Sequence, residues 1–243
     1  MENRRIIINE DPKSPIAEAY RTLRTNIMFS GIDKEIKSLV VTSSGAGEGK
    51  STTSTNMAVA FAQSGKKVLL IDADLRKARL HKHFKVSNDF GLSKAMIENK
   101  SIDSYTQKSE IKNLSLLTAG KTPPNPSEML GSKKMKQLID SAKESFDMVI
   151  IDSPPVGFVT DGALLASFAD GTVLVAAAGQ ADIKAVQHTK SLLDNVNANI
   201  IGVVLNKIPM SSNGYYKYHY YSYSNDSYFD EKPKKKGLFR KKA

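Results

Sequence analysis

Short apolar runs alternate with amphipathic stretches along the chain between about residues 37 and 208. The apolar runs are rich in Val, Ile and Leu and are mostly uninterrupted by polar residues. This pattern is typical of strands that are buried on both faces of a parallel sheet. We expect such strands at 38–42, 67–72, 114–118, 148–152, 172–177 and 200–206.

The stretches between these runs repeat apolar residues every three or four positions, which predicts helices. The expected helices span 50–64, 132–145, 161–168 and 183–196. Alternating strands and helices predict an α/β fold with a mostly parallel central sheet that is flanked by helices. Asp161 opens one of these helices as an N-terminal acid, and we assign it no chemical role.

A further helix is predicted over residues 15–29, with Ser14 as its N-cap and Pro15 at its first position. Its apolar stripe is expected to contain Ile16, Ala19, Leu23 and Ile27. Three charged residues lie mostly off that stripe, namely Glu18, Arg21 and Arg24. By spacing alone, they predict an ordinary surface ion pair between neighbouring turns.

The last part of the chain has a different composition. Helical and strand periodicity end after Pro209, so we expect a folded domain over 1–209 and a flexible tail over 210–243. The chain carries a net charge of +10, and residues 232–243 hold seven Lys or Arg and no acid. Seven of the nine tyrosines lie just before that basic segment: Tyr215, Tyr216, Tyr218, Tyr220, Tyr221, Tyr223 and Tyr228.

Composition also excludes several classes of protein. The chain has no cysteine, so it has neither disulfides nor cysteine-ligated zinc or iron–sulfur clusters. No apolar run approaches the roughly 20 residues that a membrane-spanning helix needs.

The first predicted strand leads into the sequence SSGAGEGKS at 43–51, which then opens a helix. Glycines in this setting allow backbone N–H groups to converge on phosphate oxygens. The standard pattern has glycine where this chain has Ser44. We predict a nucleotide phosphate site made of Gly45, Ala46, Gly47, Glu48, Gly49, Lys50, Ser51 and Thr52.

Acidic residues end two other predicted strands. Asp72 ends the strand at 67–72, with Asp74 two residues further, and Asp152 follows four apolar residues at 148–151. In open α/β sheets, ligands bind at the carboxyl ends of the strands, beside the phosphate loop. Carboxylates there can hold Mg²⁺ or accept a proton from an attacking hydroxyl.

Taken in order, the segments EAYRTLR, GEGKST, DADLR and VIIDSPP and the tyrosine-rich end closely resemble one family. They are similar to the bacterial tyrosine kinases of capsule and exopolysaccharide systems, the CpsD/CapB family. The three central motifs match its Walker A loop, its A-prime motif and its Walker B aspartate.

The resemblance implies an ATP- and Mg²⁺-dependent protein-tyrosine kinase that phosphorylates its own tyrosine cluster in trans. Lys50 would stabilise phosphate charge, with Asp72 as the base. Ser51, Asp74 and Asp152 would hold Mg²⁺, and Asn206 would contact adenine. Glu18, Arg21 and Arg24 would pack subunits into a ring, an octamer when unphosphorylated.

The same resemblance implies several partners. They are the cytoplasmic tail of a separate transmembrane activator, a cognate tyrosine phosphatase and protein substrates in polysaccharide synthesis. Such a kinase would be cytoplasmic and held at the inner face of the membrane through its activator.

Two alternatives remain at this stage. A switch ATPase of the MinD/ParA type shares the phosphate loop and acidic motifs, but it carries a signature lysine where this chain has Gly45. The basic, tyrosine-rich tail also suits binding to nucleic acid or to an anionic membrane surface. We do not expect nucleic acid to be the primary partner, because the core is so plainly a nucleotide site.

Overall fold

A computed structural model describes residues 6–31, 35–98 and 101–209 of the chain. The tyrosine cluster and the basic segment lie outside these residues, so the predicted flexible tail and the boundary after residue 209 stay predictions. Within the described residues, no helix is long and apolar enough to cross a bilayer.

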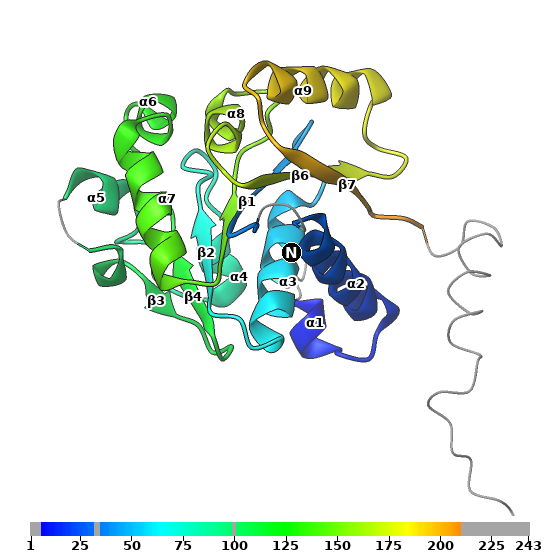
Figure 1. Cartoon of the computed structure of the whole chain (residues 1–243), viewed down its shortest axis with the longest axis horizontal. Helices are drawn as coiled ribbons and strands as arrows, with labels where there is room; N and C mark the ends of the chain where they lie inside the picture. Colours follow the sequence, from blue (N-terminus) through cyan, green and yellow to red (C-terminus); the bar gives the residue numbers. More distant parts are fainter. Residues whose placement is uncertain (1–5, 32–34, 99–100, 210–243) are drawn as a thin grey trace, which may run out of the picture. The chain divides into compact units, whose positions relative to one another are not determined.

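One seven-stranded sheet forms the centre of the described residues, in the spatial order β3-β4-β2-β5-β1-β6-β7 (Figure 1). All neighbouring strands run parallel except β3 and β4, which confirms the predicted α/β fold. The strands are β1 Ser38–Ser43, β2 Val68–Asp72, β3 Gln107–Lys108, β4 Leu114–Leu117, β5 Met148–Asp152, β6 Gly171–Ala177 and β7 Ile200–Asn206. The six expected strands are present to within one residue at each end. The sequence did not predict β3, because its two polar residues form no apolar run.

Helices cover both faces of the sheet (Figure 1). The expected helices are present to within two residues at each end, and four short ones join them. The α-helices of the described residues are α1 Ile7–Glu10, α2 Pro15–Ser30, α3 Lys50–Gln63, α4 Leu80–Phe84, α5 Leu92–Ile97, α6 Pro126–Leu130, α7 Lys133–Ser145, α8 Asp161–Ala166 and α9 Ile183–Asn195.

Alternation along the strands produces two hydrophobic cores. In β1, Leu39 and Val41 pack with α1 to α4, whereas Val40 packs with α5 to α9 on the opposite face. Successive strand side chains point to opposite faces, so a strand that is covered on both sides must be apolar throughout. The sheet is therefore held rigidly between two helical layers, and its strand ends are fixed relative to one another.

The buried face of α2 differs from the predicted stripe. The N-cap is as expected, since the Ser14 hydroxyl accepts the Ala17 N–H at 3.2 Å. However, Ile16 is half exposed, and Ala17 and Tyr20 are buried instead. The helix turns this face inward because the large Tyr20 ring buries more apolar surface than the Ala19 methyl group.

Arg24 belongs to the same inward face. Its Nη1 donates to the Ala60 carbonyl of α3 at 3.2 Å. Glu18 and Arg21 form the predicted ion pair at 2.9 Å near the surface, and Arg21 also donates to the Pro12 carbonyl at 2.7 Å. The three charged residues of α2 thus have different environments, which periodicity alone did not show.

A carboxylate fixes the end of the sheet opposite the phosphate loop. One oxygen of Asp170 accepts the backbone N–H and the hydroxyl of Ser38, each at 2.9 Å, and the other accepts Lys143 Nζ at 2.9 Å. Burial acts to raise the pKa of Asp170, but the hydrogen bonds from Lys143 and Ser38 outweigh it and hold the pKa below its usual value. The ionised form is therefore the one that stabilises the fold.

We predict that Asp170→Asn lowers the free energy of unfolding at pH 7 by about 1–3 kcal/mol, the cost of a lost charged hydrogen bond. Because the folded-state pKa is depressed, the stabilisation is complete above the unfolded pKa and disappears as pH falls through the folded pKa. Denaturant unfolding of both proteins at pH 7 and at successively lower pH measures the difference. A gap between wild type and variant that stays constant down to about pH 3 would contradict the assignment.

Candidate active site

Three sequence motifs meet at the carboxyl ends of adjacent strands. β1 lies between β5 and β6, and β2 lies on the other side of β5. Asp72 and Asp152 are direct partners in the register of β2 and β5, and Val41 of β1 is also opposite Asp152. The sheet order thus brings the phosphate loop, the paired aspartates and the single aspartate together, as the sequence predicted.

The phosphate loop is closed by its own side chains. The Ser44 hydroxyl donates to Glu48 Oε1 at 2.6 Å, and the Ser44 N–H donates to Glu48 Oε2 at 3.2 Å. Ser44 occupies the position where the usual loop has glycine, and Glu48 provides an acceptor for it. The departure from the standard pattern is therefore a stabilised feature of the loop, whose crest at Ala46 and Gly47 remains exposed.

Asn206, at the end of β7, also braces this loop. Its Nδ2 donates to the Glu48 carbonyl at 3.0 Å. Gly49 has a φ of +96°, and a Cβ built there would collide with the Asn206 amide. Asn206 consequently lies against the loop, and its predicted contact with adenine stays a prediction.

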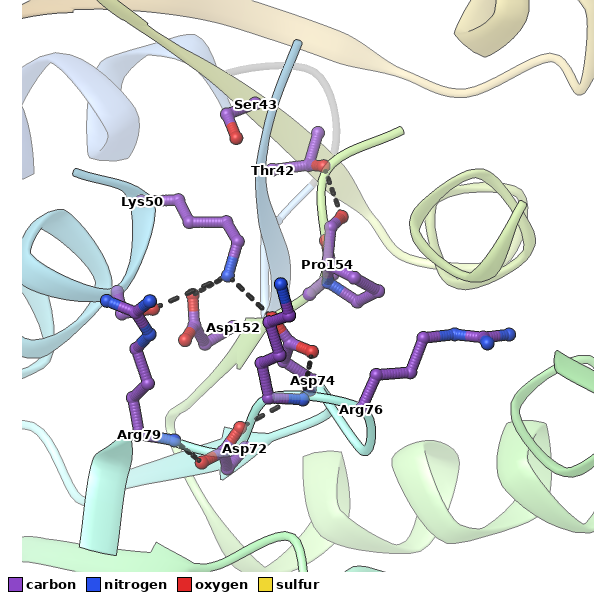
Figure 2. Close-up of polar contacts among 12 residues, drawn as sticks. Thr42, Ser43, Lys50, Asp72, Asp74, Arg76, Arg79, Asp152 and Pro154 are labelled. Carbon is purple, nitrogen blue, oxygen red and sulfur yellow. Dashed lines mark hydrogen bonds and ion pairs between the residues drawn. The ribbon is translucent and has the colours of Figure 1, made fainter. Parts of the chain in front are cut away.

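Lys50 is the centre of the site (Figure 2). Its Nζ lies 3.0 Å from Asp74 Oδ2, 4.0 Å from Asp152 Oδ1 and 3.4 Å from the Ser51 hydroxyl. Burial acts to lower the pKa of Lys50, but the charges of Asp152, Asp74 and Asp72 outweigh it and raise the pKa above its usual value. Lys50 is thus a permanent cation that is held among carboxylates at the loop mouth.

Asp152 has one partnered and one unpartnered oxygen. Oδ1 accepts the Ser54 hydroxyl at 3.1 Å, whereas Oδ2 is buried and has no hydrogen-bond partner among the described residues. Burial raises the pKa of this wholly buried carboxyl, and the neighbouring Lys50 opposes that rise. A buried, unsatisfied carboxylate oxygen beside a phosphate loop suits a cation or its water ligand.

The described residues hold no group of three or more acidic, histidine or cysteine side chains that could bind a metal ion by themselves. An ion at Asp152 would therefore need phosphate oxygens and the Ser51 hydroxyl to complete its ligands. Ser51 and Asp152, with Asp74 beside Lys50, are suitable ligands for Mg²⁺ when a nucleotide is bound.

Asp72 and Asp74 differ in their surroundings. Asp72 Oδ2 accepts the N–H groups of Arg79 and Leu80 at 2.9 and 3.0 Å, so it holds the loop after β2 (Figure 2). Burial, followed by the charge on Asp152, raises the pKa of Asp72 to about 7. Asp74 instead faces Lys50 through Oδ2. The motif therefore divides into a carboxylate that fixes the loop and one that faces the nucleotide site.

Two residues that contribute to the site, Ser54 and Asp161, were not predicted from the sequence. Ser54 lies one helical turn after Lys50, and that spacing was the available signal for its contact with Asp152. Asp161 is completely buried and binds Arg76 with N–O distances of 2.9 and 3.2 Å, which no local pattern indicated. Glu18, Arg21 and Arg24 lie on α2 and make no described contact with the nucleotide site, and the tail tyrosines lie outside the described residues.

These features define a P-loop nucleotide-binding protein. They are a glycine-rich loop between a buried strand and a helix, Lys–Ser at the helix start, and carboxylates from two adjacent strands. The chain matches the AAA domain family over residues 36–203. It is 44% identical over 216 residues to the tyrosine-protein kinase YwqD of Bacillus subtilis (strain 168), covering 89% of this chain and 91% of YwqD. It is 38% identical over 199 residues to the tyrosine-protein kinase ptk of Acinetobacter johnsonii, covering 82% of this chain but 27% of ptk.

The kinase domain of the Escherichia coli tyrosine kinase ETK has the same fold, with a TM-score of 0.82 and 33% identity over 86% of this chain and 82% of that domain. The chain belongs to the family of bacterial tyrosine-protein kinases, which confirms the resemblance seen in its motifs. The cell division ATPase MinD of Pyrococcus furiosus shares the fold alone. It is 24% identical, with a TM-score of 0.63, and the match covers 72% of this chain and 74% of MinD.

Gly49→Ala should lower nucleotide affinity at least about tenfold, because the new methyl group strains a left-handed residue and displaces Asn206 from the loop. Gly65→Ala is the matched control, since Gly65 also has a positive φ of +92° but has open space around it. Titration with a fluorescent ATP analogue compares the two variants with wild type. Equal losses of affinity in both variants would show that the Gly49 effect is general destabilisation.

Proposed function

We propose that this kinase transfers the γ-phosphoryl group of ATP to tyrosines in the C-terminal segment of a neighbouring copy. One observation carries the proposal: Lys50 lies at the mouth of a phosphate loop, within 3.0 Å of Asp74 and 4.0 Å of Asp152. Phosphoryl transfer depends chiefly on positioning and on neutralising phosphate charge. Lys50 provides positive charge for the phosphates, and the carboxylates beside it can accept a proton or hold a divalent ion.

The residues of the site have separate roles in this reaction. The amides of the loop from Gly45 to Ser51 bind phosphate oxygens, and Lys50 neutralises charge on the outer phosphates. A tyrosine hydroxyl attacks the γ-phosphorus in line, its proton passes to a carboxylate, and ADP leaves. We assign that proton to Asp74, which faces Lys50, and the loop-fixing role to Asp72, to which the resemblance gave the proton.

Mg²⁺ would be held by Ser51 and Asp152, with Asp74 nearby, and it would supply additional neutralisation of the phosphates. The unpartnered oxygen of Asp152 supports this assignment. Asn206 is proposed to face adenine from the end of β7, where it already contacts the loop.

The C-terminal segment is proposed as the acceptor because seven tyrosines are concentrated there. The other two tyrosines are Tyr20, which is only 9% exposed, and Tyr105, which is 6% exposed and donates its hydroxyl to Glu98 at 2.7 Å. Each phosphotyrosine adds a charge of about −1.5 to −2, so five or six would cancel the chain's positive charge. A cognate tyrosine phosphatase would restore the starting state.

The neighbouring copy is proposed to belong to a ring, an octamer before phosphorylation. Glu18 and Arg21 keep their ion pair near the surface of α2, and the same helix exposes Ile16, Met28 and Phe29 by half or more. Exposed apolar side chains beside charged ones favour contact with another protein surface. Growing negative charge on the tails would then favour opening of the ring.

A separate transmembrane activator is proposed from the resemblance of the motifs to the CpsD/CapB family. This chain matches nearly all of YwqD but about a quarter of ptk, so some relatives carry the kinase within a much longer polypeptide. The activator's cytoplasmic tail would hold this kinase at the inner membrane face, where protein substrates of capsule or exopolysaccharide synthesis would be modified. The basic segment 232–243 gives a second possible attraction to an anionic leaflet.

A mixing experiment tests catalysis and the acceptor together. We expect no phosphotyrosine on Lys50→Met alone, and little on a variant in which all seven tail tyrosines are Phe. Mixed with ATP and Mg²⁺, the second variant should label the first, because it keeps the active site and the first keeps the acceptors. Mass spectrometry assigns each phosphate to a chain.

Labelling of Lys50→Met alone would contradict the role of the loop. Undiminished label on Tyr20 or Tyr105 of the seven-Phe variant would contradict the acceptor assignment. ATP hydrolysis without any tyrosine label in wild type would favour the switch ATPase. Lys50→Met also leaves the neighbouring carboxylates without their cation, so thermal unfolding of this variant checks that it remains folded.

The ring is tested on α2. Glu18→Ala with Arg21→Ala should shift the unphosphorylated protein to smaller species in light scattering, because the exposed Glu18 and the partly exposed Arg21 form an ion pair on the proposed interface. Arg24→Ala is the matched comparison, since Arg24 contacts α3 of its own chain and should mainly lower thermal stability. An unchanged mass for the double variant would leave the ion pair as an ordinary surface contact.

A further inference from the structure

An ion pair with a buried carboxylate connects the loop after β2 to the segment after β5. Arg76 Nε lies 2.9 Å from Asp161 Oδ2, and Arg76 Nη2 lies 3.2 Å from Asp161 Oδ1. Asp161 is completely buried, whereas the Arg76 side chain is 40% exposed. Figure 2 shows the Arg76 side chain extending away from Lys50, so its partner is not the phosphate site itself.

Ser127 of α6 is the third member of this cluster. Its hydroxyl donates to Asp161 Oδ1 at 2.6 Å and accepts from Arg76 Nη2 at 2.9 Å. Both oxygens of the buried carboxylate are thereby satisfied. Removing the cation from a buried ion pair is strongly destabilising, because it leaves the carboxylate without its partner.

The helix that begins at Asp161 packs against the residues that follow Asp152. At the next residue, Gly162, a Cβ would lie only 2.9 Å from the Pro154 carbonyl and 3.1 Å from the Ser153 hydroxyl, so α8 is packed directly on the segment that follows β5. The Thr42 hydroxyl donates to the same Pro154 carbonyl at 3.0 Å (Figure 2).

The other end of the pair leads to Asp74. Arg76 lies between Asp74 and Lys77, and the Lys77 N–H donates to Asp74 Oδ1 at 2.9 Å. Movement of Arg76 therefore moves the backbone that orients the Asp74 carboxylate. The chain of contacts runs from Asp74 through Arg76 and Asp161 to the strand that carries Asp152.

We infer that Arg76 is a positioning residue that acts through Asp161 to hold the Asp74 loop at a fixed spacing from Asp152. It touches neither Lys50 nor the phosphate loop among its described contacts, so its effect falls on the alignment of the carboxylates. This inference rests on the proposed function, because it needs Asp74 and Asp152 to serve the same reaction. Ser127 connects the Arg76–Asp161 pair to α6, so a third segment also helps to hold the Asp74 loop in place.

The test measures phosphorylation of the Lys50→Met chain, supplied as acceptor, by Arg76→Gln, Asp161→Asn and the double variant. We expect each single change to lower kcat about 10²-fold, the usual effect of a displacement near 1 Å, with ATP affinity within about threefold of wild type. Because the two residues act as a unit, the double variant should lose no more than the worse single variant. Lys190→Gln, which breaks an exposed 2.6 Å pair with Asp194 on α9, is the matched control and should be unaffected.

Arg76→Gln leaves Asp161 buried without its cation and lowers thermal stability, whereas the double variant contains no buried charge there and keeps the fold for the measurement. Full activity in the double variant, additive losses, or a loss confined to ATP affinity would overturn the inference. Absence of label from wild type would instead refute the proposed kinase function, so the two failures are distinguishable.

Discussion

The structure depends on the burial of one lysine among three carboxylates. Lys50 is 11% exposed at its side chain, and Asp74 and Asp152 are less exposed still. A buried charge is tolerated only where opposite charge and hydrogen bonds replace water. The surrounding sheet, loop and helices supply those replacements, and any change in their spacing exposes an uncompensated charge.

The order of the sheet explains how that spacing is kept. Because β1 lies beside β5, and β5 beside β2, three motifs that are far apart in sequence end at one edge. Apolar strands that are covered on both faces leave little freedom to slide, since a slip of one residue would turn core side chains to the wrong face. The chemistry of the site therefore depends on the two cores that hold the strands in register.

Much of this organisation could be predicted from the sequence, because buried strands and amphipathic helices leave local patterns. The strand ends at Asp72 and Asp152 and the loop at Lys50 followed directly from those patterns. The inward face of α2 could not be predicted in the same way, since Ala17 and Tyr20 are buried only through the packing of α1 and α3. The partnership of Arg76 with Asp161 joins residues 85 positions apart, and no local signal reports it.

The charges of the site also explain why a cation belongs with the nucleotide. Lys50 provides one positive charge, while Asp72, Asp74 and Asp152 provide up to three negative charges. Burial already raises the pKa of Asp72 to about 7 and raises that of Asp152 as well, so the site resists further negative charge.

A triphosphate adds several negative charges, and one lysine cannot neutralise both these and the carboxylates. If Asp152 and Ser51 hold Mg²⁺ as proposed, the added positive charge would lessen that repulsion, and Lys50 would be available to the phosphates. Asp74 would then be a carboxylate without its former cation, beside the γ-phosphate, which is the environment that a proton acceptor requires.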